Sequence, residues 1–221
     1  MVMRKIAILM VATSAVLAAG CNRQSTTTSK DRNQEQVSVK IELDQVSTVN
    51  SKGSADWNGK THQFMVGYGK HGIGCVGSTF EEGVTPLGKF KVNAILSENK
   101  FEMDETLIKT SGRTKDYLAN HLFKNMSSID FKGDGETGEY GSGYISLTPV
   151  PPTPQPFDFN TYKGIFRWYS FAIHGTNDES RIGKKVTGGC INMANNEIDK
   201  LIQNIKLGDE VVITSRQPCT N

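Results

Sequence analysis

The chain has 221 residues, of which 37% are hydrophobic, and a formal net charge of +2. This length favours a single domain with a tail, and the hydrophobic fraction is ordinary for a soluble globular domain. Arg4 and Lys5 are the only charged residues among residues 1–20, which we expect to be removed, so the remaining side chains carry a balanced formal charge. A balanced charge gives no electrostatic reason to expect nucleic-acid binding.

Residues 1–20 have the pattern of a secretory signal peptide. Arg4 and Lys5 precede an apolar stretch at 6–17, which is too short for a good transmembrane helix. Residues 17–21, LAAGC, resemble a bacterial lipobox, which implies cleavage before Cys21 and acylation of that cysteine. We therefore expect a periplasm-facing membrane anchor, in the outer membrane if the host has two membranes. An ordinary cleaved signal peptide is the alternative.

Residues 22–36 are polar and have no apolar periodicity, which is typical of disorder. We expect residues 21–36 to form a disordered tether that holds a catalytic domain, residues 37–216, close to the cell wall.

The domain has the pattern of a mainly β fold. Residues 37–43 alternate strictly between apolar and polar, as a half-buried strand does. Further strands are predicted at 63–69, 88–96, 144–147, 170–173 and 209–214, and helices at 115–124 and 195–206. In the second helix Asn195 or Asn196 is the expected N-cap, and Gly208 lies just past its end. We expect a β-sandwich or barrel with one or two peripheral helices.

Residues 97–161 form a Gly- and Pro-rich insert in this pattern. Its prolines, at 149–156, favour extended polyproline geometry and oppose a helix or a central strand. The insert is either a surface excursion or a flap over a functional cleft. Trp168 and Tyr169 follow it and are candidates to line such a cleft, although at least one of them is expected in the core.

The most informative stretch runs from residue 170 to residue 193. It places His174 16 positions before Cys190, which two glycines precede. A thiol becomes a good nucleophile as the thiolate, and an imidazole can accept its proton. Glycines allow backbone N–H groups to converge on one point, as an oxyanion requires. The stretch therefore predicts a nucleophile, a base and an oxyanion hole.

Two ordered motifs resemble the L,D-transpeptidase (YkuD) family. Residues 174–176, HGT, and 187–192, TGGCIN, are similar to its catalytic signature, and residues 85–90, TPLGKF, resemble its T-P-x-G-x-F segment. The resemblance covers roughly residues 37–215, with only a loose match at 97–161. It implies a YkuD-like fold and action on peptidoglycan stem tetrapeptides, without a metal or organic cofactor.

The resemblance also implies residue roles. Cys190 would attack the carbonyl of the third stem residue, His174 would move the proton, and the backbone carbonyl of Gly175 would orient the imidazole. Thr187 would support the loop, and the N–H groups of Gly188, Gly189 and Cys190 would face the oxyanion. The family usually has His at the position of Gly188, so any side-chain role of that His is absent here.

Four other positions are weaker candidates. The candidate substrate contacts are Asn192, Arg181, Trp168 and Tyr169. For Arg181, a solvated loop position is the more common role of such a residue. We expect Cys190 to stay a free thiol for catalysis and Cys21 to carry lipid. Cys75 and Cys219 are then the remaining pair that could form a disulfide in an oxidising compartment. The remaining histidines, 62, 71 and 121, lie in no motif and are expected to be structural or surface residues.

Three functions remain open from the sequence. The first is an L,D-transpeptidase that transfers the acyl group to an amine. The second is an L,D-carboxypeptidase or related hydrolase, in which water takes the acyl group. The third is a wall-binding lipoprotein with a degenerate site.

No zinc-type spacing such as C-x-x-C is present in the sequence.

Overall fold

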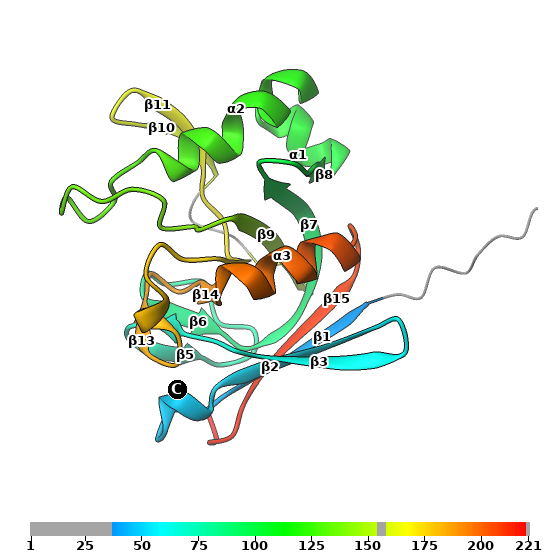
Figure 1. Ribbon diagram of the computed structural model, residues 1–221, viewed down its shortest axis with the longest axis vertical. Coiled ribbons are helices and arrows are strands. Elements are labelled where there is room, and N and C mark those ends of the chain that lie inside the picture. The colour runs from blue at the N-terminus through cyan, green and yellow to red at the C-terminus, as the bar shows by residue number, and fades with distance from the viewer. Residues whose placement is uncertain (1–36, 154–157, 220–221) are drawn as a thin grey trace, which may run out of the picture. The chain divides into compact units, whose positions relative to one another are not determined.

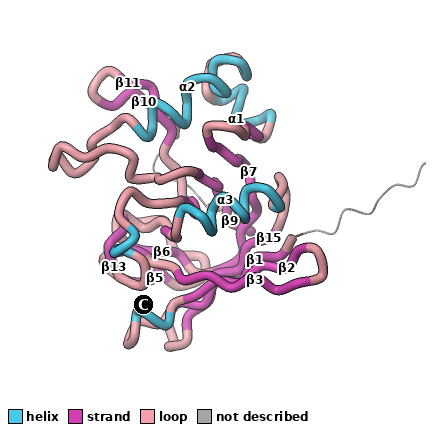
Figure 2. Tube along the Cα trace, in the orientation of Figure 1, coloured by secondary structure: helices cyan, strands magenta, loops and turns pink. Residues whose placement is uncertain are grey.

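The computed structural model describes residues 37–153 and 158–219, and more of this part of the chain is strand than helix (Figure 2). The predicted signal peptide, Cys21 and the tether lie outside the described residues. The strands are β1 (Ser38–Leu43), β2 (Lys52–Trp57), β3 (Lys60–Met65), β4 (Tyr68–Gly69), β5 (Gly72–Gly74), β6 (Val84–Pro86), β7 (Gly88–Ser97), β8 (Phe101–Met103), β9 (Gly143–Val150), β10 (Phe159–Tyr162), β11 (Ile165–Trp168), β12 (Ala172–His174), β13 (Lys185–Thr187), β14 (Ile191–Asn192) and β15 (Glu210–Ser215). The helices are α1 (Glu105–Thr110), α2 (Lys115–Ser127) and α3 (Asn195–Asn204), with short 3-10 turns at Thr48–Asn50 and Glu179–Arg181.

Nine strands form one curled sheet in the order β14-β12-β9-β7-β15-β1-β2-β3, with β8 added beside β7. The β1–β15 and β12–β14 pairs are parallel, and the other pairs are antiparallel. Three two-stranded sheets complete the domain, which confirms the predicted mainly β class. Three α-helices are found in the described residues where one or two were expected.

The large sheet separates two hydrophobic cores because successive side chains of a strand point to opposite faces. Ile173 of β12 and Ile145 of β9 join the core that contains α3. Their neighbours Ala172 and Tyr144 join a second core, built with α1, α2 and β11. Cys190 also belongs to the second core. Figure 1 shows α2 and the β10–β11 hairpin side by side on this second side.

The two predicted helices are present, but one of them is capped differently. Thr114 caps α2, since its hydroxyl accepts a hydrogen bond from the N–H of Tyr117 at 3.1 Å. In α3 the N-cap position is Ala194, which makes no side-chain capping bond. Asn195 is instead the first helical residue, and its amide oxygen accepts from the backbone N–H of Thr176 at 3.1 Å. The expected cap at Asn195 or Asn196 was therefore wrong.

Two strand predictions need correction. The stretch 63–69 is not one strand, because β3 ends at Met65. After Val66 and Gly67 the chain enters a different sheet as β4. Pro149 lies inside β9 and pairs with Phe90, although proline was expected to oppose a central strand. The proline is tolerated because β12 pairs with β9 only over residues 144–146, so Pro149 has no strand on its second side.

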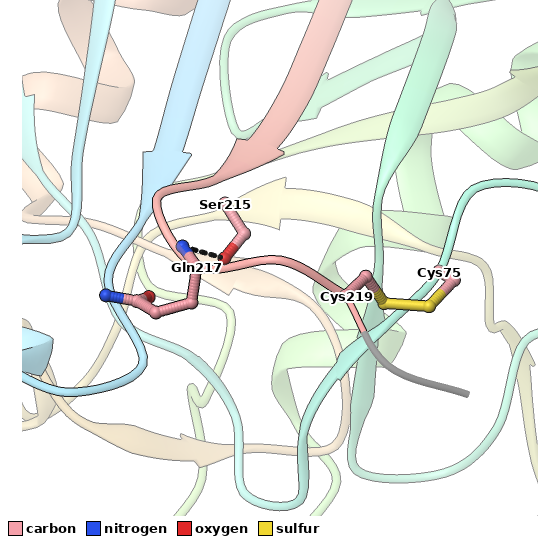
Figure 3. Close-up of a disulfide and its surroundings, with 4 residues drawn as sticks. All are labelled: Cys75, Ser215, Gln217 and Cys219. Carbon is pink, nitrogen blue, oxygen red and sulfur yellow. Dashed lines mark hydrogen bonds between the residues drawn. A yellow bond between two sulfur atoms is a disulfide. The ribbon is translucent and has the colours of Figure 1, made fainter.

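The C-terminal segment is joined covalently to the loop after β5. Cys75 and Cys219 form a disulfide across 144 positions of sequence, which confirms the predicted pairing (Figure 3). In the same segment the N–H of Gln217 donates to the Ser215 hydroxyl at 3.2 Å. Cys190 is the free cysteine of the described residues. Among those residues no helix has the length and hydrophobicity needed to cross a membrane.

Candidate active site

A pocket of about 450 Å³ opens on the second-core side of the sheet and contains Cys190 and His174. One wall comes from the sheet and its loops: Lys70, Glu82, Tyr169, Arg181, Val186, Thr187 and Gly188. The facing wall comes from the insert and its hairpin: Phe131, Lys132, Glu139, Tyr140, Tyr162 and Arg167. The insert is therefore more than a surface excursion, since it supplies a wall of the pocket.

His174 is held in one tautomer. Its Nδ1 lies 2.5 Å from the carbonyl oxygen of Gly175, and a carbonyl can only accept, so Nδ1 carries the proton. The ring also meets Tyr140 edge-on, with ring centroids 5.1 Å apart. Burial lowers the pKa of His174 to about 4, although the Gly175 contact opposes this shift. The imidazole is therefore neutral, and its Nε2 is unprotonated and able to accept a proton.

Cys190 is a buried, protonated thiol. Its side chain is 5% exposed, and burial raises its pKa to about 12, with a smaller contribution from the negative charge of Glu82. Sγ donates to the carbonyl oxygen of Ser170 at 3.6 Å. The described residues include no hydrogen bond between this thiol and His174. The resting pair is thus neutral, and the thiol must turn from Ser170 to reach a base.

Thr187 holds the loop before the cysteine. Its hydroxyl donates to the carbonyl of Cys190 at 2.6 Å and accepts from the N–H of Gly189 at 3.1 Å, while its side chain is buried. A second threonine, Thr85, donates to the carbonyl of Gly189 at 2.7 Å. Gly189 has φ +125°, and an added Cβ would lie 2.8 Å from the carbonyl oxygen of Val84. Glycine is therefore required at this turn.

Two backbone donors remain for an oxyanion, one fewer than the sequence suggested. The N–H of Gly189 is committed to Thr187, and Gly189 does not line the pocket. The N–H groups of Gly188 and Cys190 have no acceptor within the described residues, and both residues line the pocket. We therefore reassign the expected oxyanion hole to these two groups.

A family comparison matches the larger part of the chain. Residues 45–213 match the YkuD family, described as the L,D-transpeptidase catalytic domain. The chain therefore belongs to the L,D-transpeptidase family. The match lies inside the predicted domain, residues 37–216.

Individual relatives match shorter parts of this L,D-transpeptidase domain. "Putative L,D-transpeptidase YqjB" of Bacillus subtilis (strain 168) is 50% identical over 44 residues, which are 20% of this chain and 25% of that protein. "Putative L,D-transpeptidase in ATP synthase subunits region ORF 5" of Fuscovulum blasticum is 32% identical over 68 residues, 31% of this chain and 35% of that protein. The chain thus matches about a third or less of the length of these relatives.

Solved structures of L,D-transpeptidases resemble the domain at low identity. The enzyme from Mycobacterium smegmatis has 13% identity and a TM-score of 0.40, with 80% of this chain and 58% of that chain covered. L,D-transpeptidase 3 from Mycobacterium tuberculosis, solved with a faropenem-derived adduct, has 12% identity and a TM-score of 0.42 over 80% of this chain and 60% of that chain.

Of the two aromatic candidates for the cleft, one lines it and one does not. Tyr169 lines the pocket, and its hydroxyl donates to Glu82 at 3.3 Å. Trp168 is 3% exposed and stacks on Phe159, with ring centroids 5.2 Å apart. The two residues are neighbours at the end of β11, so their side chains point in opposite directions. Trp168 is therefore a residue of the second core and not a substrate contact.

The two polar candidates also divide. Asn192 is 1% exposed, its backbone pairs with Gly67, and it does not line the pocket, so it has no access to substrate. Its side-chain oxygen is buried without a hydrogen-bond partner. Arg181 does line the pocket, and one of its guanidinium nitrogens donates to the carbonyl of Val186 at 3.1 Å. It is therefore partly committed to its own loop.

Several residues of the site carried no sequence signal. Glu82, Tyr140 and Ser170 lie in no motif, and only the fold brings them to Cys190. Thr85 belongs to the T-P-x-G-x-F segment, so that segment could have indicated its contact with Gly189. Within the described ranges, no three His, Cys, Asp or Glu side chains converge as metal ligands would.

Proposed function

We propose that this protein is a cysteine L,D-transpeptidase that acts on peptidoglycan stem tetrapeptides, releases the terminal D-Ala and transfers the acyl group to an amine. Family membership supports the class of enzyme. The observation that carries the residue assignment is the 2.5 Å contact of His174 Nδ1 with Gly175, because it leaves Nε2 as a base in the pocket that Cys190 lines.

Acylation begins when the Cys190 thiol turns from Ser170 towards the carbonyl carbon of the third stem residue. The S–C bond forms while the thiol proton passes to Nε2 of His174. Because the thiol pKa is near 12 and the imidazole pKa near 4, a resting thiolate–imidazolium pair is unfavourable, and proton transfer accompanies attack. The N–H groups of Gly188 and Cys190 stabilise the oxyanion, a contribution of about 3 kcal/mol for each donor.

Collapse of this intermediate breaks the C–N bond to D-Ala. The imidazolium of His174 gives its proton to the leaving amine, and a thioester on Cys190 remains. An amine acceptor then attacks the thioester carbonyl, loses a proton to Nε2 of His174, and displaces the thiolate, which recovers that proton. No group outside the chain and its two substrates is needed for this balance.

The decisive experiment is product analysis with purified protein, a disaccharide tetrapeptide and an amine acceptor, read by mass spectrometry. We expect D-Ala release together with a cross-linked or exchanged product, and a carbapenem adduct on Cys190. Cys190→Ala is expected to abolish both. Tripeptide as the sole product would contradict transpeptidation and indicate the hydrolase. Failure of both substrate turnover and carbapenem acylation would contradict a working site and favour the wall-binding alternative.

We also propose that the protein is a lipoprotein, anchored through Cys21 on the periplasmic face of a membrane. The lipobox resemblance at 17–21 supports this, and the polar residues 22–36 give the domain reach towards peptidoglycan. Labelled fatty acid should enter the wild-type protein and not the Cys21→Ala variant. Equal labelling of the two proteins would refute lipidation at Cys21.

A further inference from the structure

Glu82 is an acidic side chain next to the proposed oxyanion site. It lies in the loop between β5 and β6, is exposed, and lines the same pocket as Cys190 and His174. The sequence gives it no motif, and the mechanism above does not use it.

The carboxylate of Glu82 is held beside Gly188. The Tyr169 hydroxyl donates to Oε2 at 3.3 Å. The other oxygen, Oε1, lies 2.7 Å from the position that a Cβ on Gly188 would take. The space above Gly188 is therefore filled by a carboxylate that reaches across from another loop.

The positive side chains of the pocket form no close ion pair with this carboxylate. No ion pair within 4.0 Å involves Glu82 in the described chain. Lys132 pairs with Glu139 at 3.1 Å. Arg167 bonds to Asn160 at 2.9 Å and lies over aromatic rings of the insert wall. Lys70 and Arg181 line the pocket without such a contact to Glu82.

An unpaired carboxylate at this place opposes the reaction. Attack by Cys190 creates negative charge on the substrate oxygen, and the field of Glu82 disfavours it. The same field contributes to the raised pKa of the Cys190 thiol. A cation bound at Glu82 would remove both effects, because opposite charges within about 4–6 Å compensate each other.

We propose that Glu82 binds a primary ammonium group of the substrate beside Cys190 and makes the enzyme selective for substrates that carry one. The proposal rests on the proposed function and adds a substrate contact to it. The ammonium group has two possible sources: the side chain of the dibasic third residue in the donor, or the amine of the acceptor before it attacks. Substrate binding at Glu82 then completes the electrostatics that acyl transfer requires.

The test compares Glu82→Gln with Glu81→Gln. Gln at 82 keeps an acceptor for Tyr169 and removes the charge. Glu81 is also exposed and adjacent in sequence but does not line the pocket, so its variant removes an equal charge without touching the site. For each protein, the acylation rate is measured with tetrapeptide whose third-residue side-chain amine is either free or acetylated. Transfer to a simple amine acceptor is then measured against hydrolysis.

A donor ammonium at Glu82 predicts that Glu82→Gln slows acylation by the free-amine donor about tenfold or more, as loss of a charge-assisted contact does. The acetylated donor should be unaffected or faster. An acceptor ammonium predicts unchanged acylation and a similar loss in aminolysis relative to hydrolysis. Glu81→Gln should match wild type in every assay.

The ammonium site would be overturned if Glu82→Gln matched wild type both in acylation and in aminolysis relative to hydrolysis. Equal losses of acylation rate with the free and acetylated donors would also overturn it. The proposed function fails separately: wild-type protein would then form no acyl-enzyme with either donor and no carbapenem adduct.

Discussion

Removing the Thr187 hydroxyl should test the loop that presents Cys190. Valine is nearly isosteric with threonine, so Thr187→Val leaves no cavity but deletes two buried hydrogen bonds, to Cys190 at 2.6 Å and from Gly189 at 3.1 Å. Each bond contributes about 1 kcal/mol net, and each stranded polar group costs about 1–3 kcal/mol. Because Thr187 is 4% exposed, water cannot readily replace the hydroxyl. We expect a loss of about 2–4 kcal/mol in the free energy of unfolding.

The same substitution should reduce the rate of acylation. It frees the segment from Gly188 to Cys190 that supplies both proposed oxyanion donors, and a displacement of about 1 Å can reduce a rate about 10²-fold. Urea denaturation gives the stability change, and the rate of carbapenem adduct formation on Cys190 gives the kinetic change. Thr187→Ser keeps the hydroxyl and should stay close to wild type. A valine variant within about 0.5 kcal/mol of wild type, or a serine variant as impaired as valine, would refute this account.

Three further predictions concern pH, backbone geometry and the disulfide. The unfolded state takes up a proton on His174 below pH 6.5, while the folded imidazole stays neutral down to about pH 4. The free energy of unfolding of the wild type should therefore fall by about 3 kcal/mol more than that of His174→Gln between pH 7 and pH 4, as measured by urea titrations. Plots of this free energy against pH that run parallel for the two proteins would contradict the prediction. Gly189→Ala should cost roughly 2 kcal/mol or more because of its φ of +125°. Gly188→Ala should cost less than about 1 kcal/mol, because the one close contact of its Cβ is with the end of the flexible Glu82 side chain, and equal midpoints in urea for the two variants would count against the assigned turn. Replacing both Cys75 and Cys219 by Ala should lower stability by up to about 5 kcal/mol, because the disulfide closes a loop of 144 positions, and an unchanged thermal midpoint would argue against the bond.

The elements that could be predicted from sequence are those whose pattern is local. β1 and β7 alternate clearly, and α3 carries a regular apolar stripe, so each was found within a few residues. Short strands such as β13 and β14 are only 3 and 2 residues long, and their pairing depends on distant partners. No local pattern could reveal them.

The residues of the candidate site also differ in whether they could be predicted from the sequence. Cys190 and His174 were found from their spacing and residue chemistry, and the Gly175 carbonyl lies where the family resemblance implied. Asn192 was misplaced because a linear motif does not tell which side of a loop a side chain occupies, and here the backbone turns it behind Gly67. Glu82 was missed because long-range hydrogen bonds bring its loop to the cysteine, such as the one from the N–H of Gly83 to the carbonyl of Gly188 at 2.8 Å.

The large sheet separates substitutions that alter stability from those that alter the substrate pocket. Among the described residues, the core on the α3 side includes none of the pocket residues of the insert and meets the pocket through Tyr169, so substitutions away from Tyr169 should alter stability while the pocket keeps its shape. The insert side holds Cys190 and also supplies one pocket wall, so changes in its length or aromatic content reshape the substrate site directly. A lineage could exchange this wall for another while β12 and the cysteine loop stay as they are. Substrate preference and foldability can therefore evolve on opposite faces of one sheet.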